Sequence, residues 1–381
     1  MAVNKVVYDG NTLVDLTSDT VTPDTLMEGT TAHNAAGESI VGTGEIASGL
    51  EIPLSEQDML IAQIAAALEG KAAGGGGSEE EWIGDGNTHI WVHLGEGRTS
   101  PMLGVCPNGT VTVDWGDGTT PDVLTGTSTS TVKWTSKHNY AAPGDYVITL
   151  TVNGTMGFYG TATSSEYSAI LRHSSSADGR NFAYRNAVRK VEIGNGVTSV
   201  ANYAFYACYV IEGVKIPDGV TSIGNYAFAY CYNLADIEIP DSVTSMGTDV
   251  FNNCNRIASM KIPDGVKSIG ERAFNQCRGV VSIGLPAGAT SIGGSAFSSN
   301  YTLTSVSIPS GVTSIGAAAF NECSSLAKIR FNSTTPPKVA NSNAFTNIPT
   351  DCVISVPVGK LSAYKSATNY PSSSKYTYIE E

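Results

Sequence analysis

Residues 216–238 read IPDGVTSIGNYAFAYCYNLADIE, and variants of this 23-residue unit recur through the second half of the chain. A fixed period of this length predicts a solenoid, in which each repeat supplies one layer of a continuous core. The phenylalanine of the unit marks the period at Phe205, Phe228, Phe251, Phe274, Phe297 and Phe320, and Phe345 follows after 25 residues.

A second column of the repeat stands three residues after the phenylalanine, at Cys208, Cys231, Cys254, Cys277, Asn300 and Cys323. Disulfide frameworks belong mainly to small secreted domains, and the spacing of a zinc site does not occur. The cysteines therefore predict a buried ladder of small, reduced side chains. Asn300 occupies one rung, which fits a packing role and fits catalysis poorly.

Over residues 188–356 the unit resembles the BspA-type leucine-rich repeat of bacterial surface proteins and some phage tail proteins. Its departures, Met246, Ala289 and Asn300, fall at packing positions. The tail CVISVPVGKLSAYKSATNY resembles the C-terminal cap of such arrays, with a strand at Val353–Val356 and a short helix that covers the open edge. The resemblance implies a capped leucine-rich-repeat solenoid over residues 188–381.

The N-terminal residues 1–53 predict a small β module. KVVYDGNTLVDLT indicates a hairpin with Asp9-Gly10-Asn11 as its turn, and Thr22-Pro23 begins a short helix. The strings GNTLVDLTSDTVTP and AHNAAGESIVGTG resemble a module common in tail and baseplate proteins of phages of Gram-positive bacteria. The resemblance implies attachment to phage tail or baseplate proteins.

Residues 54–69 predict a helix that is too short to be stable alone in water. We expect it to form a parallel homo-oligomer, with a trimer favoured, or to pack on the N-terminal module. The helix is followed by a Gly-rich linker at residues 70–81. The apolar positions at heptad-like spacing are Leu54, Ile61, Ile64 and Leu68.

Residues 82–153 predict a β-sandwich, because alternating apolar runs are separated by turn signals. VDWGDGT, HNY and PGDYVITLTV follow one another in an order that resembles the PKD domain, an immunoglobulin-like spacer or binding module. Trp115 is expected in its core. Asp114, Asp117 and Asp122 could bind calcium or, as we favour, cap turns. Residues 154–187 are expected to connect to the solenoid and to include its N-terminal cap.

Charge and composition exclude several functions. The net charge is −13, from 22 Lys and Arg against 35 Asp and Glu. Residues 1–187 contribute −14 (8 against 22) and the rest contributes +1 (14 against 13). The acidic half should repel nucleic acid. The sequence predicts neither a secretory signal at its first residues nor a membrane-spanning helix, since it has no apolar run of the required length. The five His residues lie outside the repeats, and no catalytic motif or cofactor site is expected.

The outward positions of the repeated strands form a ladder that begins Glu192, Lys215, Glu238 and Lys261. Parallel strands stack about 4.8 Å apart, so we expect these side chains to pair across strands and to fix the register.

Variable positions lie in the two residues after each phenylalanine and the two after each cysteine. Tyr, Asn, Ser and Arg predominate there, as they do in binding surfaces. The alternative is that the polar residues only solvate the helical side of the solenoid. For the tyrosines we favour binding, because clustered exposed aromatics are costly. The candidate receptor-binding residues are Tyr206, Tyr209, Tyr230, Tyr232, Asn253, Asn255, Gln276, Arg278 and Tyr301.

These features predict a mainly β, multidomain, non-enzymatic protein. The leading hypothesis is a phage tail-fibre or baseplate-associated protein that presents the solenoid to a host cell-surface glycan or protein. It would assemble in the host cytoplasm and act extracellularly on the virion. The alternatives are a bacterial surface adhesin, a fibre of a phage-like contractile injection system and, third, a glycan depolymerase.

Overall fold

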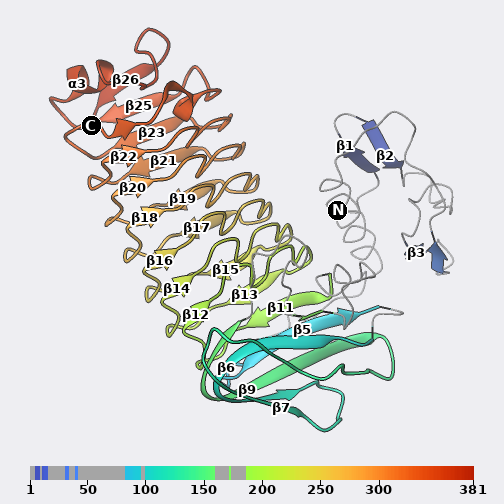
Figure 1. Ribbon diagram of the computed structural model, residues 1–381. Helices are drawn as coiled ribbons and strands as arrows, with labels where there is room; N and C mark the ends of the chain where they lie inside the picture. Colours follow the sequence, from blue (N-terminus) through green and yellow to red (C-terminus); the bar gives the residue numbers. More distant parts are fainter. Residues whose placement is uncertain are drawn as a thin grey trace. The chain divides into compact units, whose positions relative to one another are not determined.

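The computed structural model describes residues 82–95, 99–158, 171–172 and 186–381, together with the backbone of short strands nearer the N-terminus (Figure 1). The chain divides into two compact units, Met1–Trp82 and Ile83–Glu381. The N-terminal unit contains an antiparallel hairpin of β1 (Lys5–Tyr8) and β2 (Asn11–Asp15), as predicted, and a second pair, β3 (Thr31–His33) and β4 (Ser39–Val41).

Several predictions for the N-terminal unit lie outside the described residues. They are the helix after Thr22-Pro23, the linker at 70–81 and the helix at 54–69 with its apolar positions Leu54, Ile61, Ile64 and Leu68. Oligomerisation through that helix therefore stays a prediction.

The second unit begins with antiparallel strands, which we call the β unit. They are β5 (Thr88–Leu94), β6 (Met102–Asp114), β7 (Asp122–Thr127), β8 (Lys133–Trp134) and β9 (Gly144–Phe158). β6 pairs with β7, β8, β9 and the short β10 (Leu171–Arg172). Trp115 is fully buried, as predicted. The antiparallel strands agree with the sequence, and the closer assignment to the PKD fold stays a prediction.

The sheet of the β unit continues directly into the solenoid. β5 pairs antiparallel with the first solenoid strand, β11 (Val188–Glu192), and the sheet runs in the order β10-β6-β9-β5-β11-β13-β15. A second connection joins β9 to the first repeat, because the Met156 amide donates to the Gly196 carbonyl at 2.8 Å. β5 thus covers the edge of β11. Of residues 154–187, which were expected to include the N-terminal cap, residues 159–170 and 173–185 lie outside the described residues, so that expectation stays a prediction.

Each solenoid repeat contributes two short parallel strands in full-repeat register, so that Val214 lies beside Ile237. The first ladder comprises β11, β13 (Gly213–Lys215), β15 (Asp236–Glu238), β17 (Ser259–Lys261), β19 (Ser282–Gly284), β21 (Ser305–Ile308), β23 (Lys328–Phe331) and β25 (Val353–Val356). The second comprises β12 (Ser199–Val200), β14 (Ser222–Ile223), β16 (Ser245–Met246), β18 (Ser268–Ile269), β20 (Ser291–Ile292), β22 (Ser314–Ile315) and β24 (Lys338–Val339).

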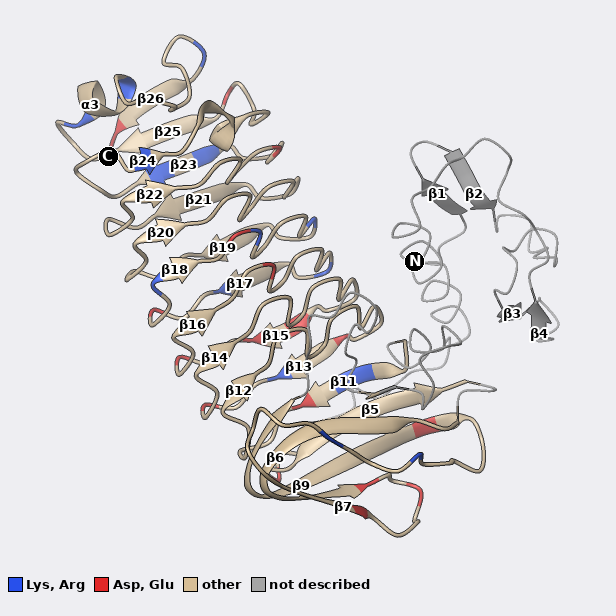
Figure 2. Ribbon diagram, viewed as in Figure 1, with Lys and Arg blue, Asp and Glu red and all other residues tan. Residues whose placement is uncertain are grey.

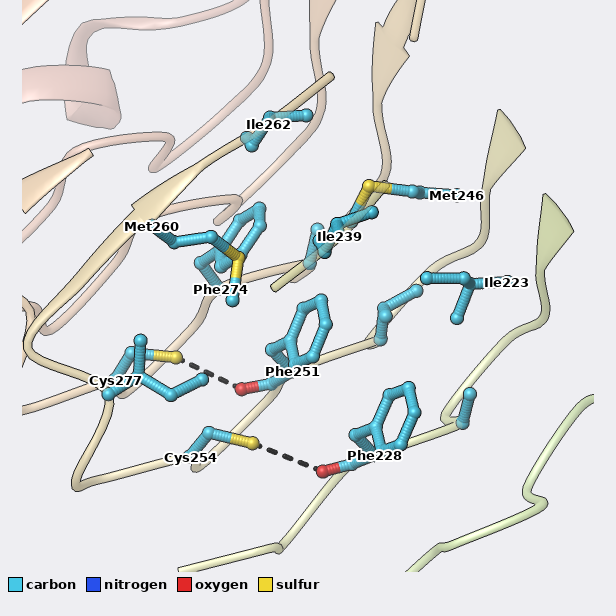
Figure 3. Packing of buried hydrophobic residues seen from close by; sticks show 14 of the residues in the cluster. Ile223, Phe228, Ile239, Met246, Phe251, Cys254, Met260, Ile262, Phe274 and Cys277 are labelled. Atoms are coloured by element: carbon cyan, nitrogen blue, oxygen red, sulfur yellow. Dashed lines mark hydrogen bonds between the residues drawn. The ribbon is translucent and has the colours of Figure 1, made fainter. Parts of the chain in front are cut away.

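The core between the ladders is the predicted stack of phenylalanines and cysteines (Figure 3). Consecutive phenylalanine rings are stacked, with Phe205 and Phe228 centroids 5.3 Å apart. In four repeats the cysteine thiol donates to the carbonyl of the preceding repeat's phenylalanine, as from Cys254 to Phe228 at 3.1 Å; the other three are Cys231, Cys277 and Cys323. All cysteines are free and buried, and burial raises the pKa of Cys277 to about 12. The packing interpretation of the cysteine column is therefore confirmed.

The side of each repeat that carries the phenylalanine and cysteine is built from turns, so the expected helical side is wrong. In the six repeats from Phe205 to Phe320, the residues two before and two after the phenylalanine have left-handed backbone, with φ of 60° at Tyr203 and 57° at Ala207. Because of these left-handed residues, backbone amides of the turn point toward the next repeat along the solenoid. Tyr203, Phe205 and Ala207 donate to carbonyls of the next repeat at 2.8–2.9 Å. These inter-repeat hydrogen bonds offset the strain of left-handed backbone at residues other than glycine.

Strand pairing stops at one place in the solenoid, between β15 and β17 and between β16 and β18. We call this place the seam. On the turn side the repeats remain joined across it, since Asp249, Phe251 and Asn253 amides donate to the next repeat at 2.8–2.9 Å. Met246 and Met260 pack on its two sides (Figure 3). The flexible thioether side chain suits an irregular gap of this kind.

The C-terminal end contains the predicted strand β25 and a short helix, α3 (Leu361–Lys365). The edge of β25 is covered by a further parallel strand, β26 (Thr377–Glu380), whereas the sequence assigned that role to the helix. Tyr364 of α3 is fully buried and donates its hydroxyl to the Ser333 carbonyl at 2.8 Å. The helix therefore anchors the last loops, and the added strand extends the sheet.

Candidate interaction surface

The predicted binding residues lie on the turn side of the solenoid, which we call the turn face. It comprises residues 202–210 and the equivalent segments of later repeats, 225–233, 248–256, 271–279, 294–302 and 317–325. Left-handed backbone at fixed positions places equivalent side chains in columns that run from repeat to repeat. The turn face therefore has three neighbourhoods of different chemistry.

Tyrosines dominate the first neighbourhood. Tyr206 and Tyr230 are half-buried, and their ring centroids lie 5.4 Å apart in an edge-to-face arrangement. Tyr203 and Tyr226 stack at 4.8 Å, and Tyr206 contacts both. The part of these rings that reaches the surface forms an aromatic platform with hydroxyl groups, which we call the tyrosine patch (Tyr203, Tyr206, Tyr226 and Tyr230).

Tyr209 and Tyr232 correct the prediction that the positions after cysteine are exposed. Their exposed fractions are only 9% and 5%, and their rings stack at 5.3 Å with an interplanar angle of 8°. Burial raises the pKa of Tyr232 far above its ordinary value. The physical reason is the turn geometry, which folds the chain after cysteine back over the repeat. Tyr232 also contacts the neighbouring Tyr230 edge to face, with ring centroids 6.2 Å apart.

The second neighbourhood is a polar network around a buried carboxylate. Asp249, 1% exposed, accepts from Arg272 Nε at 2.9 Å and from Asn252 Nδ2 at 3.0 Å. Asn253 is 8% exposed and donates to Asn252, so the prediction of an exposed Asn253 is wrong. Asn255 is half-buried, and its side-chain oxygen has no hydrogen-bond partner among the described residues.

The third neighbourhood brings together the candidate residues Gln276, Arg278 and Tyr301. The Arg278 guanidinium lies 5.7 Å from the Tyr301 ring centroid, and its Nη2 donates to Gln276 Oε1 at 3.4 Å. Tyr301 is 37% exposed, and its hydroxyl donates to Glu322 Oε2 at 3.4 Å. A ligand here would meet an exposed cation, an aromatic ring and a carboxylate.

Sequence reasoning missed Tyr203 and Tyr226, which complete the tyrosine patch. It considered only positions after phenylalanine and cysteine, whereas these tyrosines stand two residues before phenylalanine. The same column continues as Asp249 and Arg272, which form the salt bridge of the next neighbourhood. The 23-residue spacing of this column was the available signal.

The strand ladder differs in part from its prediction (Figure 2). Lys215 pairs with Glu192 at 2.8 Å, as expected, but Glu192 is only 5% exposed because the backbone at Ile83 and Gly84 covers it. Both amides donate to its carboxylate. Lys261 lies beyond the seam and pairs with Asp241 at 3.6 Å. The alternating ladder therefore ends where the strand pairing ends.

The weak calcium candidates Asp114, Asp117 and Asp122 have separate partners. Asp114 caps the turn at the Gly116 amide, Asp117 accepts from the Thr119 amide and hydroxyl, and Asp122 accepts from Trp115 Nε1. The hydrogen bonds at Asp114 and Asp117 are those of the turn-capping interpretation. Within residues 82–95, 99–158, 171–172 and 186–381, no cluster of three metal-binding side chains occurs. The same residues contain no helix long and apolar enough to cross a membrane.

Comparison with known proteins agrees with the repeat geometry. The family described as BspA type Leucine rich repeat region matches residues 158–278 and 249–355, which together are about half of the chain. The chain therefore belongs to this family of leucine-rich repeat proteins. Membership supports a general surface-binding role.

Solved structures similar to this chain include a leucine rich cell surface protein from Faecalibacterium prausnitzii, with 31% identity and a TM-score of 0.40. That match covers 49% of this chain and 53% of the other, so it spans about half the length of that protein. The Leucine Rich Repeat protein of T. pallidum is 28% identical, with 42% and 78% covered and a TM-score of 0.37. No curated protein matches the chain.

Proposed function

We propose that this protein is a receptor-binding component of a phage tail fibre or baseplate, and that its solenoid contacts a host cell-surface glycan or protein. The observation that carries the binding role is the columnar turn face on a family scaffold of surface proteins. The tyrosine patch supports a ligand there, because Tyr supplies rigid amphipathic contact area at low entropic cost.

Binding through the tyrosine patch is tested with intact chain and whole bacterial cells. Tyr206→Ser combined with Tyr230→Ser should weaken adsorption at least tenfold, while Asn321→Ser, in the column of Tyr206, should leave it unchanged. Tyr209 and Tyr232 are excluded from the variant because their burial makes them part of the core. Equal adsorption by the folded double variant and the wild type would show that the tyrosine patch does not bind the cell surface.

The phage assignment extends the proposal to the N-terminal unit. The module of residues 1–53 would attach to tail or baseplate proteins, and the helix of residues 54–69 would hold the chains as a homo-oligomer, a trimer by preference. Cryo-electron microscopy of the native particle would show the chain at the tail with a copy number divisible by three. Light scattering should show a lower mass after deletion of residues 54–69.

A bacterial surface adhesin is the second candidate, and the family match favours it because this repeat type is found in surface proteins of bacteria. Antibodies against the chain distinguish the two. Labelling of purified virions supports the tail protein, whereas labelling of the bacterial envelope in cells free of phage supports the adhesin.

A further inference from the structure

A groove of about 520 Å³ lies where the β unit meets the first repeats of the solenoid. One wall is the loop at Thr129 and Ser130, and the opposite wall is formed by β12, β14 and the start of β16. The β9–first-repeat contact at Met156 and Gly196 joins these two parts of the second unit (Figure 1). The volume of the groove falls in the range of ligand-binding sites, which often lie between domains.

The walls of the groove are held firmly in place. A side chain on Gly157 would collide with the Thr129 carbonyl at 2.5 Å, so the loop rests directly on β9. Ser128 and Ser130 hydroxyls bond each other at 2.8 Å within that loop. On the solenoid side, the Gly224 amide donates to the Val200 carbonyl at 2.8 Å. A ligand would therefore meet a largely preformed surface.

The lining of the groove is uncharged and rich in small polar side chains. Among its residues there is no Lys, Arg, His, Asp or Glu. The apolar members Phe158, Val200 and Ile223 are at most 2% exposed, and Ala201 is half-buried, so the lining offers no large apolar side chain to a ligand. The lining residues that can form hydrogen bonds through side-chain hydroxyls or amides are Thr129, Ser130, Ser199, Asn202, Ser222, Asn225 and Ser245.

The two asparagines are oriented by their contacts. Asn202 Oδ1 accepts from the Asn225 amide at 2.7 Å, and Asn225 Oδ1 accepts from the Thr248 amide at 2.8 Å. Because the side-chain oxygens are used, each asparagine has its NH₂ group left as a donor. Ser199, Ser222 and Ser245 add hydroxyls at the strand spacing of about 4.8 Å. The groove thus presents repeated neutral donors and acceptors.

We infer that this groove binds a neutral oligosaccharide. Such a ligand carries many hydroxyl and ether oxygens, has no charge to compensate and repeats along its length as the serine column does. A charged polymer would find no counter-ion in the lining, and an apolar peptide would find no large apolar side chain at the surface. The inference rests on the proposed function in taking a cell-surface glycan as the ligand, and it assigns a site whose lining contains no residue of the neighbouring tyrosine patch.

The test uses intact chain and a panel of immobilised glycans. The neutral probes are oligomers of N-acetylglucosamine, glucose, galactose and mannose, and the charged probes are sialyllactose and heparin. We expect binding to at least one neutral probe, little change between low and high salt because no charge is involved, and no binding to the charged probes.

The groove variant is Ser222→Trp, which places an indole in the groove. Its matched control is Ser314→Trp, at the same register position of a repeat outside the groove and likewise half-buried. Ser222→Trp should weaken neutral-glycan binding at least tenfold, and Ser314→Trp should bind as wild type. Equal loss in both variants, no loss in either, or preference for charged glycans would overturn the inference.

Whole-cell binding separates this inference from the proposed function. If the chain binds host cells but no neutral probe, the proposed function is supported and the inference that the groove binds a neutral oligosaccharide is contradicted. The opposite result is also informative. If the chain binds a neutral glycan, Ser222→Trp abolishes that binding and the chain binds no host cell, the groove inference is supported and the proposed function is contradicted.

Discussion

At the scale of single residues, some columns of the repeat have a packing role and others supply the chemistry of the surface. The thiol of Cys277 donates to the Phe251 carbonyl at 3.0 Å, and the same contact recurs in neighbouring repeats. Asn300 occupies this rung and is fully buried, yet neither of its side-chain polar atoms has a partner among the described residues. The cysteine column is thus optimised for this site, and the asparagine is a local defect.

Asn300→Cys should therefore raise the free energy of unfolding, by about 1–3 kcal/mol, which is the usual cost of an unsatisfied buried polar group. The new thiol would face the Phe274 carbonyl, 26 residues earlier, as in other repeats. Chemical denaturation of intact chain measures the change. Cys254→Asn is the reverse control and should lower stability. A less stable Asn300→Cys chain would show that Asn300 has partners that this account lacks.

Glu192 is a residue whose contribution depends on pH. Burial tends to raise the pKa of its carboxyl, but hydrogen bonds from Lys215 and from the Gly84 and Ile83 amides outweigh burial and lower it below the ordinary 4.5. A depressed folded-state pKa stabilises the fold above the unfolded-state pKa, and this stabilisation is lost as pH falls through the folded-state value.

Glu192→Gln should lower the free energy of unfolding at pH 7 by about 1.5–3 kcal/mol, the range for hydrogen bonds to a charged group. The difference from wild type should shrink as pH falls from 4.5 through the lower folded-state pKa, because the carboxyl of the folded wild type becomes neutral over that range. Denaturation at a series of pH values measures this. A difference that stays constant down to pH 2 would contradict the assigned contacts.

At the scale of elements, the seam divides the strand ladders while the turn face continues across it. β13 and β21 each pair with strands on both sides, whereas β15 and β17 each lack one paired neighbour. Repeat proteins are held by nearest-neighbour interfaces, so one weaker interface marks the place where the array opens most readily.

Hydrogen exchange should reveal the seam. Amides of Asp236–Glu238 and Ser259–Lys261 should exchange about tenfold faster than those of Gly213–Lys215 and Ser305–Ile308, because local opening costs less free energy there. Mass spectrometry of peptides from the intact chain measures the rates. Uniform protection across these strands would mean that the seam is as strong as the other interfaces.

At the scale of the whole molecule, the sequence predicted the repeat far better than its surface. Phe205 and Cys208 recur with fixed spacing because each must fill the same space in a layer, so their burial could be read from the period. The burial of Tyr232 could not be read from the sequence. It depends on left-handed turns at residues other than glycine, which leave no sequence signal of their own. The pairing of β5 with β11 also escaped prediction, since it joins strands about 100 residues apart.

The most direct test of the binding role is a titration of labelled intact chain on cells of a panel of Gram-positive bacteria. The account predicts saturable binding to cells of the host and none to unrelated cells. It also predicts weaker binding when Tyr206 and Tyr230 are both replaced by Ser. Binding that never saturates, or that is equal on every cell type, would contradict the claim that this solenoid recognises a specific surface ligand.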